Sequence, residues 1–220
     1  MCARLAAGCP DAFPRDLVVS ALTPDSDHVF SIVARNGDGL LSAAAPDSAV
    51  ATTLARVPPA PRVRSDGGGG LVIVLDAGGN PARTTYAIAF DDGRYAALGG
   101  RRADSARFAT LSEWHGGTGA TRVWELIPDT RYRVHVVARN AAQQPSTGSS
   151  GDTAWTAPAP PSQLSASVAG AFEVRVDLVA GDNPAQTLFE VWRVAPAPSW
   201  LLGSGTVTHY QDDGLIPDRS

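Results

Sequence analysis

Apolar and polar residues alternate with a period of two along the middle of the chain, which predicts β-strands. In residues 131–139, every second side chain from Tyr132 to Ala138 is apolar, and the other positions hold Arg131, Arg133, His135, Val137 and Arg139. This pattern is typical of an antiparallel strand with one face against a core and the other in water. Residues 86–90 alternate in the same way.

Turn signals separate these segments and favour an all-β sandwich. Four glycines, 67–70, precede the short apolar run 71–75, and Asp91-Asp92-Gly93 follows an expected strand. Several short strands divided in this manner predict two packed sheets. Composition agrees, because the 220 residues include 22 Gly and 17 Pro but only four Glu and no Lys, which disfavours long helices.

An internal repeat organises the chain. The segment Leu22–Asn36 returns as Leu126–Asn140 at an offset of 104 residues, and its opening Leu-x-Pro-Asp returns once more as Leu215–Asp218. A second pair, Asn80–Tyr86 and Asn183–Phe189, has an offset of 103. Repetition at this distance indicates units of about 100 residues, the size of one sandwich.

Proline-rich seams mark the expected boundaries between these units. They lie at Pro58–Pro61 and Pro158–Pro161. We therefore predict a partial unit over residues 1–56, a complete unit over 57–157 and a second partial unit over 158–220.

The repeated segment resembles a known family. The pattern Leu-x-Pro-x-Thr-x-Tyr-x-Val-x-Val-x-Ala-x-Asn from Leu126 to Asn140 looks like the E–F corner and strand F of a fibronectin type III domain. The resemblance implies immunoglobulin-like β-sandwiches in tandem, one complete module flanked by two partial ones. It also implies that Leu126 and Pro128 shape the corner, and that Tyr132 is the tyrosine-corner residue, whose hydroxyl bonds to upstream backbone.

The sequence departs from the family pattern at identifiable positions. The slot of the family's core tryptophan in strand B holds Leu75 and Leu178, and His28 replaces the corner tyrosine in the first unit. That unit matches strands E, F and G, whereas the third matches the first strands and stops at the corner. The central unit has 14 extra residues within Arg94–Gly119, which predicts a long loop or an additional hairpin.

No pattern of an enzyme, metal site or cofactor site occurs, so we predict a protein without catalysis or cofactor. The four histidines lack metal-ligand spacing, no Gly-x-Ser-x-Gly elbow is present, and a P-loop is impossible without lysine. The segments Asp91–Gly93 and Asp212–Gly214 lack the acidic spacing of a calcium loop and favour turns. Arg35–Gly39 predicts a tight turn rather than an adhesive Arg-Gly-Asp, because Asn interrupts that motif.

Charge and hydropathy exclude two classes of partner. A net charge of −4 argues against nucleic acid, and no apolar run reaches the length of a membrane helix. The only cysteines, Cys2 and Cys9, could form at most a local bridge. Leu5–Cys9 faintly resembles a lipoprotein cleavage site but lacks a preceding apolar run.

Aromatic residues in the variable regions are the candidate binding surface. Tyr95, Trp114 and Trp200 could stack against a sugar or contact a protein partner. The competing interpretation, which we favour, makes the tryptophan a lid over the core.

Three functions remain open at this point. The first is a structural or interaction module, a spacer or adhesion-type scaffold in a bacterial extracellular or surface protein, with protein or carbohydrate ligands. The second is an accessory segment of a larger secreted hydrolase, and the third is a phage tail-tip or fibre component. The partial end units also raise the possibility that two chains complete each other head to tail, against the simpler explanation of a truncated gene.

Overall fold

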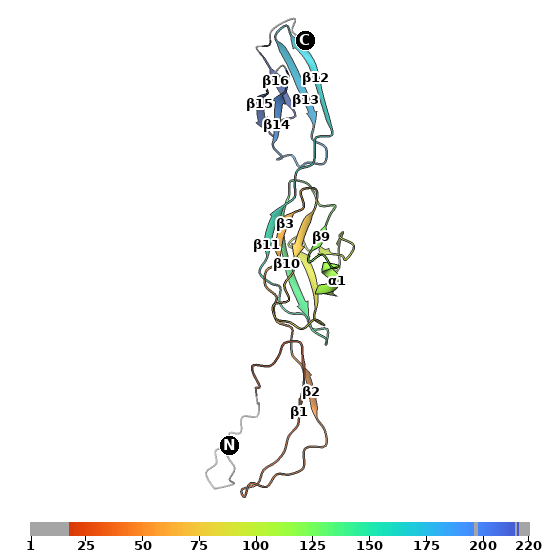
Figure 1. The fold of residues 1–220 in the computed structure, drawn as a ribbon, viewed down its shortest axis with the longest axis vertical. Helices are drawn as coiled ribbons and strands as arrows, with labels where there is room; N and C mark the ends of the chain where they lie inside the picture. The colour runs from red at the N-terminus through yellow and green to blue at the C-terminus, as the bar shows by residue number, and fades with distance from the viewer. Residues whose placement is uncertain (1–17, 196–197, 214, 216–220) are drawn as a thin grey trace.

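The structure is a computed structural model that describes residues 18–195, 198–213 and 215. These residues form three units that follow one another along the long axis of the molecule (Figure 1). We name them the N-terminal hairpin (β1–β2), the central sandwich (β3–β11) and the C-terminal unit (β12–β16). Among the described residues the single helix, α1, has five residues, which is too short to cross a bilayer.

Two antiparallel sheets make the central sandwich. The first orders β3 (Arg62–Ser65), β4 (Leu71–Val74) and β9 (Thr121–Val123). The second orders β11 (Asp152–Trp155), β10 (Arg131–Arg139), β5 (Thr85–Phe90), β6 (Tyr95–Ala96) and β7 (Arg102–Ala103), with β8 (Ala109–Thr110) also paired to β5. Two sheets that share one core in this strand order form the immunoglobulin-like sandwich of fibronectin type III domains.

The core lies between these sheets and uses the alternating positions that the sequence predicted. Val134 and Val136 of β10 and Ile88 of the neighbouring β5 share one buried cluster with Ile73 of β4 and Val123 of β9 from the other sheet. Each such side chain stabilises the fold by about 1.5–3 kcal/mol through removal of apolar surface from water.

Residues 94–119 of the central sandwich, which include its extra residues, fold into the hairpin of β6 and β7, the short strand β8 and a helix. Strands β6 and β7 pair with each other, and α1 (Leu111–His115) follows β8. The helix begins with a capping box between Thr110 and Glu113 and ends at Gly116, whose φ of 51° is left-handed. The backbone N–H and the hydroxyl of Thr110 lower the pKa of the Glu113 carboxyl. The insertion is therefore ordered structure, not a loop.

The outer units repeat parts of the central sandwich in strand order and pairing. The N-terminal hairpin, β1 (Asp27–Phe30) and β2 (Ala49–Thr52), corresponds to β10 and β11. In the C-terminal unit, β12 (Gln163–Gly170), β13 (Glu173–Val179) and β16 (His209–Asp212) correspond to the first sheet. Strands β14 (Phe189–Arg193) and β15 (Trp200–Gly205) correspond to β5 and β6.

The N-terminal unit was expected to hold counterparts of strands E, F and G. Its described residues form the last two. The positions equivalent to β9 are 17–19, which begin outside the described residues, and no strand is assigned to residues 18–19.

Candidate interaction sites

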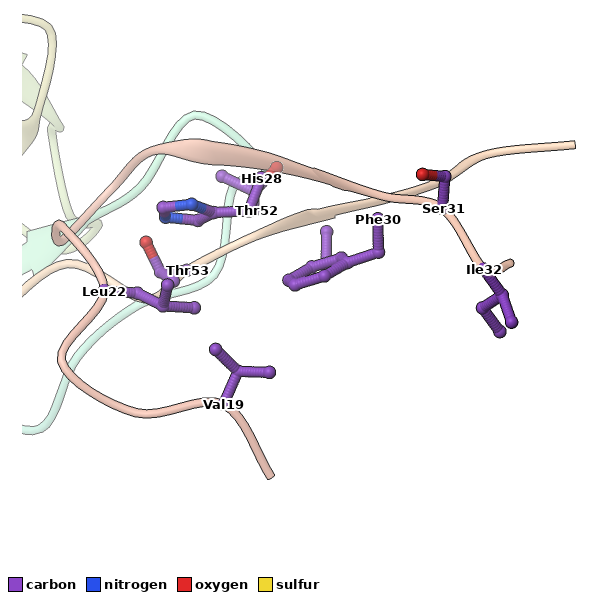
Figure 2. Close-up of a pocket in the computed structure, with 9 residues that line it drawn as sticks. Val19, Leu22, His28, Phe30, Ser31, Ile32, Thr52 and Thr53 are labelled. Carbon is purple, nitrogen blue, oxygen red and sulfur yellow. The ribbon is translucent and has the colours of Figure 1, made fainter. Parts of the chain in front are cut away.

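An open apolar groove of about 410 Å³ lies on the N-terminal hairpin (Figure 2). Its walls include Val19, Leu22, His28, Phe30, Ile32 and Thr53. At the offset of 104, the counterparts of His28, Phe30 and Ile32 are Tyr132, Val134 and Val136, which are all buried in the central sandwich. The groove is thus the inner face of a half-sandwich, and it offers apolar surface.

The groove carries no catalytic arrangement among the described residues. His28 is its only ionisable side chain, and its Nε2 lies 3.4 Å from the carbonyl oxygen of Thr23. This contact replaces the tyrosine corner. In the central sandwich, the backbone N–H of Ile127 donates to the hydroxyl of Tyr132, the counterpart of His28, at 3.0 Å.

The joint between the N-terminal hairpin and the central sandwich is closed by one carboxylate. Asp25 is fully buried, at 0% exposure, and stands at the end of the Leu-x-Pro-Asp corner with a φ of 42°. The Thr84 hydroxyl donates to its Oδ2 at 2.6 Å, and the backbone N–H of Ala141 donates to its Oδ1 at 2.8 Å. Arg83 donates from Nε to the Asp25 carbonyl oxygen at 3.0 Å, and this nitrogen lies 3.8 Å from Oδ1.

Two asparagines join the same units through backbone groups. Asn80 accepts from the backbone N–H of Arg56 at 2.7 Å and donates to the Arg56 carbonyl at 2.9 Å. The side-chain amide of Asn140, which is almost fully buried, donates to the Thr53 carbonyl at 3.0 Å. Linker polar groups that a flexible connection would leave to water therefore have partners in the central sandwich.

The joint between the central sandwich and the C-terminal unit repeats part of this arrangement. The buried Thr187 donates from its hydroxyl to Asp129 Oδ2 at 2.8 Å, and Asp129 has a φ of 43°. Asn183 accepts from the backbone N–H of Ala159 and donates to its carbonyl, both at 2.8 Å. Each contact is the counterpart of one in the first joint.

The residues to which sequence analysis gave structural roles lie in the cores or at a corner. Leu75, Leu126 and Tyr132 belong to the core cluster of the central sandwich, and Leu178 belongs to that of the C-terminal unit. Pro128 is half-buried in the corner itself. The core-tryptophan slots thus hold buried leucines.

The aromatic residues proposed as a binding surface lie in different environments. Trp114 is 4% exposed, and its indole N–H donates to the Tyr86 carbonyl at 2.7 Å, so its ring packs in the core. Tyr95 is half-buried on β6, and Trp200 begins β15 with 55% of its surface exposed. The geometry therefore does not present Tyr95 and Trp114 together as one open surface.

The acidic and glycine-rich segments are turns or strand ends. Asp91–Gly93 is the turn between β5 and β6, and Arg35–Gly39 is a turn held by the Asn36 side chain. Asp212 does not lie in a turn, because it ends β16, where it pairs with Arg193. Within the described ranges no cluster of three or more His, Cys, Asp or Glu side chains could hold a metal ion. Cys2 and Cys9 lie outside these ranges.

Sequence reasoning missed the residues of the joints as functional residues. The signal was present, because Asp25, Thr84 and Asn80 all belong to the two repeated motifs. What the sequence did not reveal is that the motifs face each other across a boundary. The Leu-x-Pro-Asp corner of the first motif belongs to one unit, and the second motif lies in the unit that follows along the chain.

Comparisons with known proteins find similar folds only among solved structures. A two-domain fibronectin type III segment of chicken tenascin is 12% identical, over 74% of this chain and 85% of that chain, with a TM-score of 0.46. The FN1–FN3 domains of chicken CNTN1 are 18% identical, over 89% and 69%, with a TM-score of 0.32. A family 28 exopolygalacturonase of Yersinia enterocolitica is 18% identical, over 48% and 21%, with a TM-score of 0.33.

No family model matches the chain, and no curated protein matches it. The fold assignment rests on the strand order of the central sandwich and on its tyrosine corner. The chain therefore has an all-β architecture of tandem units, of which the central one is an immunoglobulin-like sandwich.

Proposed function

We propose that this chain is a non-catalytic spacer and interaction segment that holds parts of a bacterial extracellular or surface protein at a set distance. The observation that carries the proposal is the succession of three units along one axis, with hydrogen-bonded joints between them (Figure 1). A spacer needs length and stiffness more than it needs chemistry, and the joints supply stiffness.

Composition and family resemblance support the bacterial and extracellular parts of the proposal. The lack of lysine beside abundant Ala, Arg, Gly and Pro fits a genome of high GC content. Fibronectin type III modules are typical of secreted and surface proteins. The partners we propose are protein or carbohydrate ligands, to which exposed apolar side chains such as Phe30 and Trp200 are accessible.

Small-angle X-ray scattering of the 220-residue chain tests the spacer proposal. We expect a distance distribution with the long tail of an elongated particle, in agreement with the profile calculated from the structure. The matched control is the chain with the linker residues 56–61 replaced by Gly and Ser, which should shorten the mean end-to-end distance. A compact distribution for the unaltered chain would contradict the proposal.

A further inference from the structure

We infer that the two repeated motifs are complementary binding surfaces, through which each unit binds the unit that follows it. The first surface is the Leu-x-Pro-Asp corner at the end of one unit. The second is the Asn-Pro-Ala-x-Thr loop of the unit that follows it. The partner of each corner is therefore another sandwich unit that carries this loop. The inference rests on the proposed spacer function and specifies how the spacer is built.

The correspondence between the two joints is the first support. Asp25 and Thr84 meet at 2.6 Å, and Asp129 and Thr187 meet at 2.8 Å. The offsets are 104 residues for the acids and 103 for the threonines. Two independent occurrences of one contact, each between the same motif positions, indicate that the motifs recur because they bind each other.

The local geometry of each motif prepares it for this contact. In both corners the acid follows proline and has a left-handed φ near 42–43°, a conformation that Asp and Asn tolerate better than most residues. In both loops the threonine N–H donates to the proline carbonyl three residues earlier, at 3.0 Å. This tight turn orients the hydroxyl toward the preceding unit.

The asparagine of the loop adds hydrogen bonds to the linker. Asn80 and Asn183 each accept from one backbone N–H of the linker and donate to the carbonyl of the same residue. Each also donates to a carbonyl of its own loop, Ala77 or Ala180, at 2.9 and 2.7 Å. The asparagine therefore ties the linker to the loop while the threonine ties the loop to the corner.

Burial shows that the first contact is closed to water, whereas in the second the threonine is buried and Asp129 is half-buried. Thr84 and Asp25 are both 0% exposed, and Thr187 is 2% exposed. A buried carboxylate requires hydrogen-bond donors, and among the described residues those of Asp25 are Thr84 and Ala141, both in the following unit. The corner and the loop are thus incomplete without each other.

Domain orientation in solution tests the inference on the full chain. We would measure residual dipolar couplings and 15N relaxation for the unaltered chain, T84V, D25N and T84S. The unaltered chain and T84S, which keeps a hydroxyl, should give one alignment tensor for the N-terminal hairpin and the central sandwich. T84V and D25N should lose that shared tensor, and the hairpin should acquire a shorter rotational correlation time.

Matched controls are T85V, which alters the neighbouring threonine, and D47N, which removes the same charge from an exposed position. Both should behave like the unaltered chain. If the hairpin unfolds in T84V, the second joint decides, because the C-terminal unit has its own core: T187V should uncouple that unit while its chemical shifts stay those of a folded sandwich.

The outcomes separate this inference from the spacer proposal. Unchanged tensors in T84V, D25N and T187V would overturn the inference and leave an elongated spacer standing. Independent alignment of the units in the unaltered chain would overturn both.

Discussion

The two joints of the molecule share the aspartate–threonine and asparagine–linker hydrogen bonds. The first joint has further contacts from an arginine side chain and from a backbone amide. In the first, Asp25 is fully buried and bonds to Thr84, to the Ala141 amide and, through its carbonyl, to Arg83. In the second, Asp129 is half-buried, and its partner across the boundary is Thr187.

Sequence differences at equivalent positions account for this contrast. Gln186 stands where the first joint has Arg83, and Arg131 stands where it has Asp27, whose carboxylate lies 3.8 Å from the Arg83 guanidinium. If arginine stood at both 186 and 131, two positive charges would lie close together. The neutral Gln186 avoids this repulsion from Arg131. The comparison teaches that the threonine and asparagine contacts are the common element and that the arginine is an addition to one joint.

The largest expected effect is the difference between D25A and D129A. Both variants lose the same left-handed corner residue, so the backbone cost cancels in the comparison. D25A leaves Thr84 and Ala141 without an acceptor and should cost about 2–4 kcal/mol, whereas D129A should cost about 1 kcal/mol. Native-state amide exchange at Thr84 and Thr187 measures each joint separately. Equal losses of protection in the two variants would break the comparison.

The asparagines should give matching effects at both joints. N80A and N183A each remove two hydrogen bonds between the linker and the loop and one within the loop, and we expect a cost of about 1–3 kcal/mol for either variant. N36A is the control, since Asn36 bonds only within its own turn. Amide hydrogen exchange at Arg56 and Ala159 of the two linkers provides the measurement. A strong loss of protection at one joint alone would show that the asparagine contacts do not contribute equally to both joints.

The fold of the central sandwich was predictable because periodicity reports burial directly. The alternation from Tyr132 to Ala138 placed its apolar residues in the core, and the resemblance placed the Tyr132 hydroxyl near upstream backbone. The helix that carries Trp114 was not foreseen. Its five residues are too few for a helical period, although Thr110 and Glu113 are a capping-box signal.

The joints could not be derived from the sequence for a different reason. Periodicity and turn chemistry describe one strand or one turn at a time, whereas Asp25 and Thr84 are 59 residues apart and meet only when two units are assembled. The repeat showed that each motif occurs more than once along the chain. Only the placement of one unit against the next shows that they contact each other.

An exchange of charges should bring the second joint closer to the first. Q186R alone should change stability by less than about 0.5 kcal/mol, because attraction to the corner is offset by repulsion from Arg131. The double variant Q186R/R131D recreates the first joint's set and should gain about 0.5–1 kcal/mol at the Thr187 amide. R131D alone is the control. If Q186R alone stabilises the Thr187 amide as much as Q186R/R131D does, the charge at position 131 does not explain the difference between the joints.

The smallest effect is a pH response confined to the first joint. Leu75 directly follows β4, and its N–H donates to His115 Nε2 at 3.3 Å, whereas the N–H of the equivalent Leu178 donates to the Thr208 carbonyl at 2.8 Å. Burial lowers the pKa of His115 below its ordinary value of 6.5.

The neutral imidazole is the form that can accept the Leu75 N–H, and the folded state favours it. This contribution to stability is therefore complete above the unfolded pKa near 6.5 and is lost as the pH falls from there through the folded pKa. Between pH 7.5 and 5.5, exchange protection should fall at Leu75 and stay constant at Leu178 after correction for intrinsic rates. The accompanying fall in Tm should stay below about 4 °C, which corresponds to 1 kcal/mol. The H115Q variant should remove the pH dependence at Leu75. A parallel loss of protection at Leu178 would show that the pH response belongs to the whole chain and not to His115.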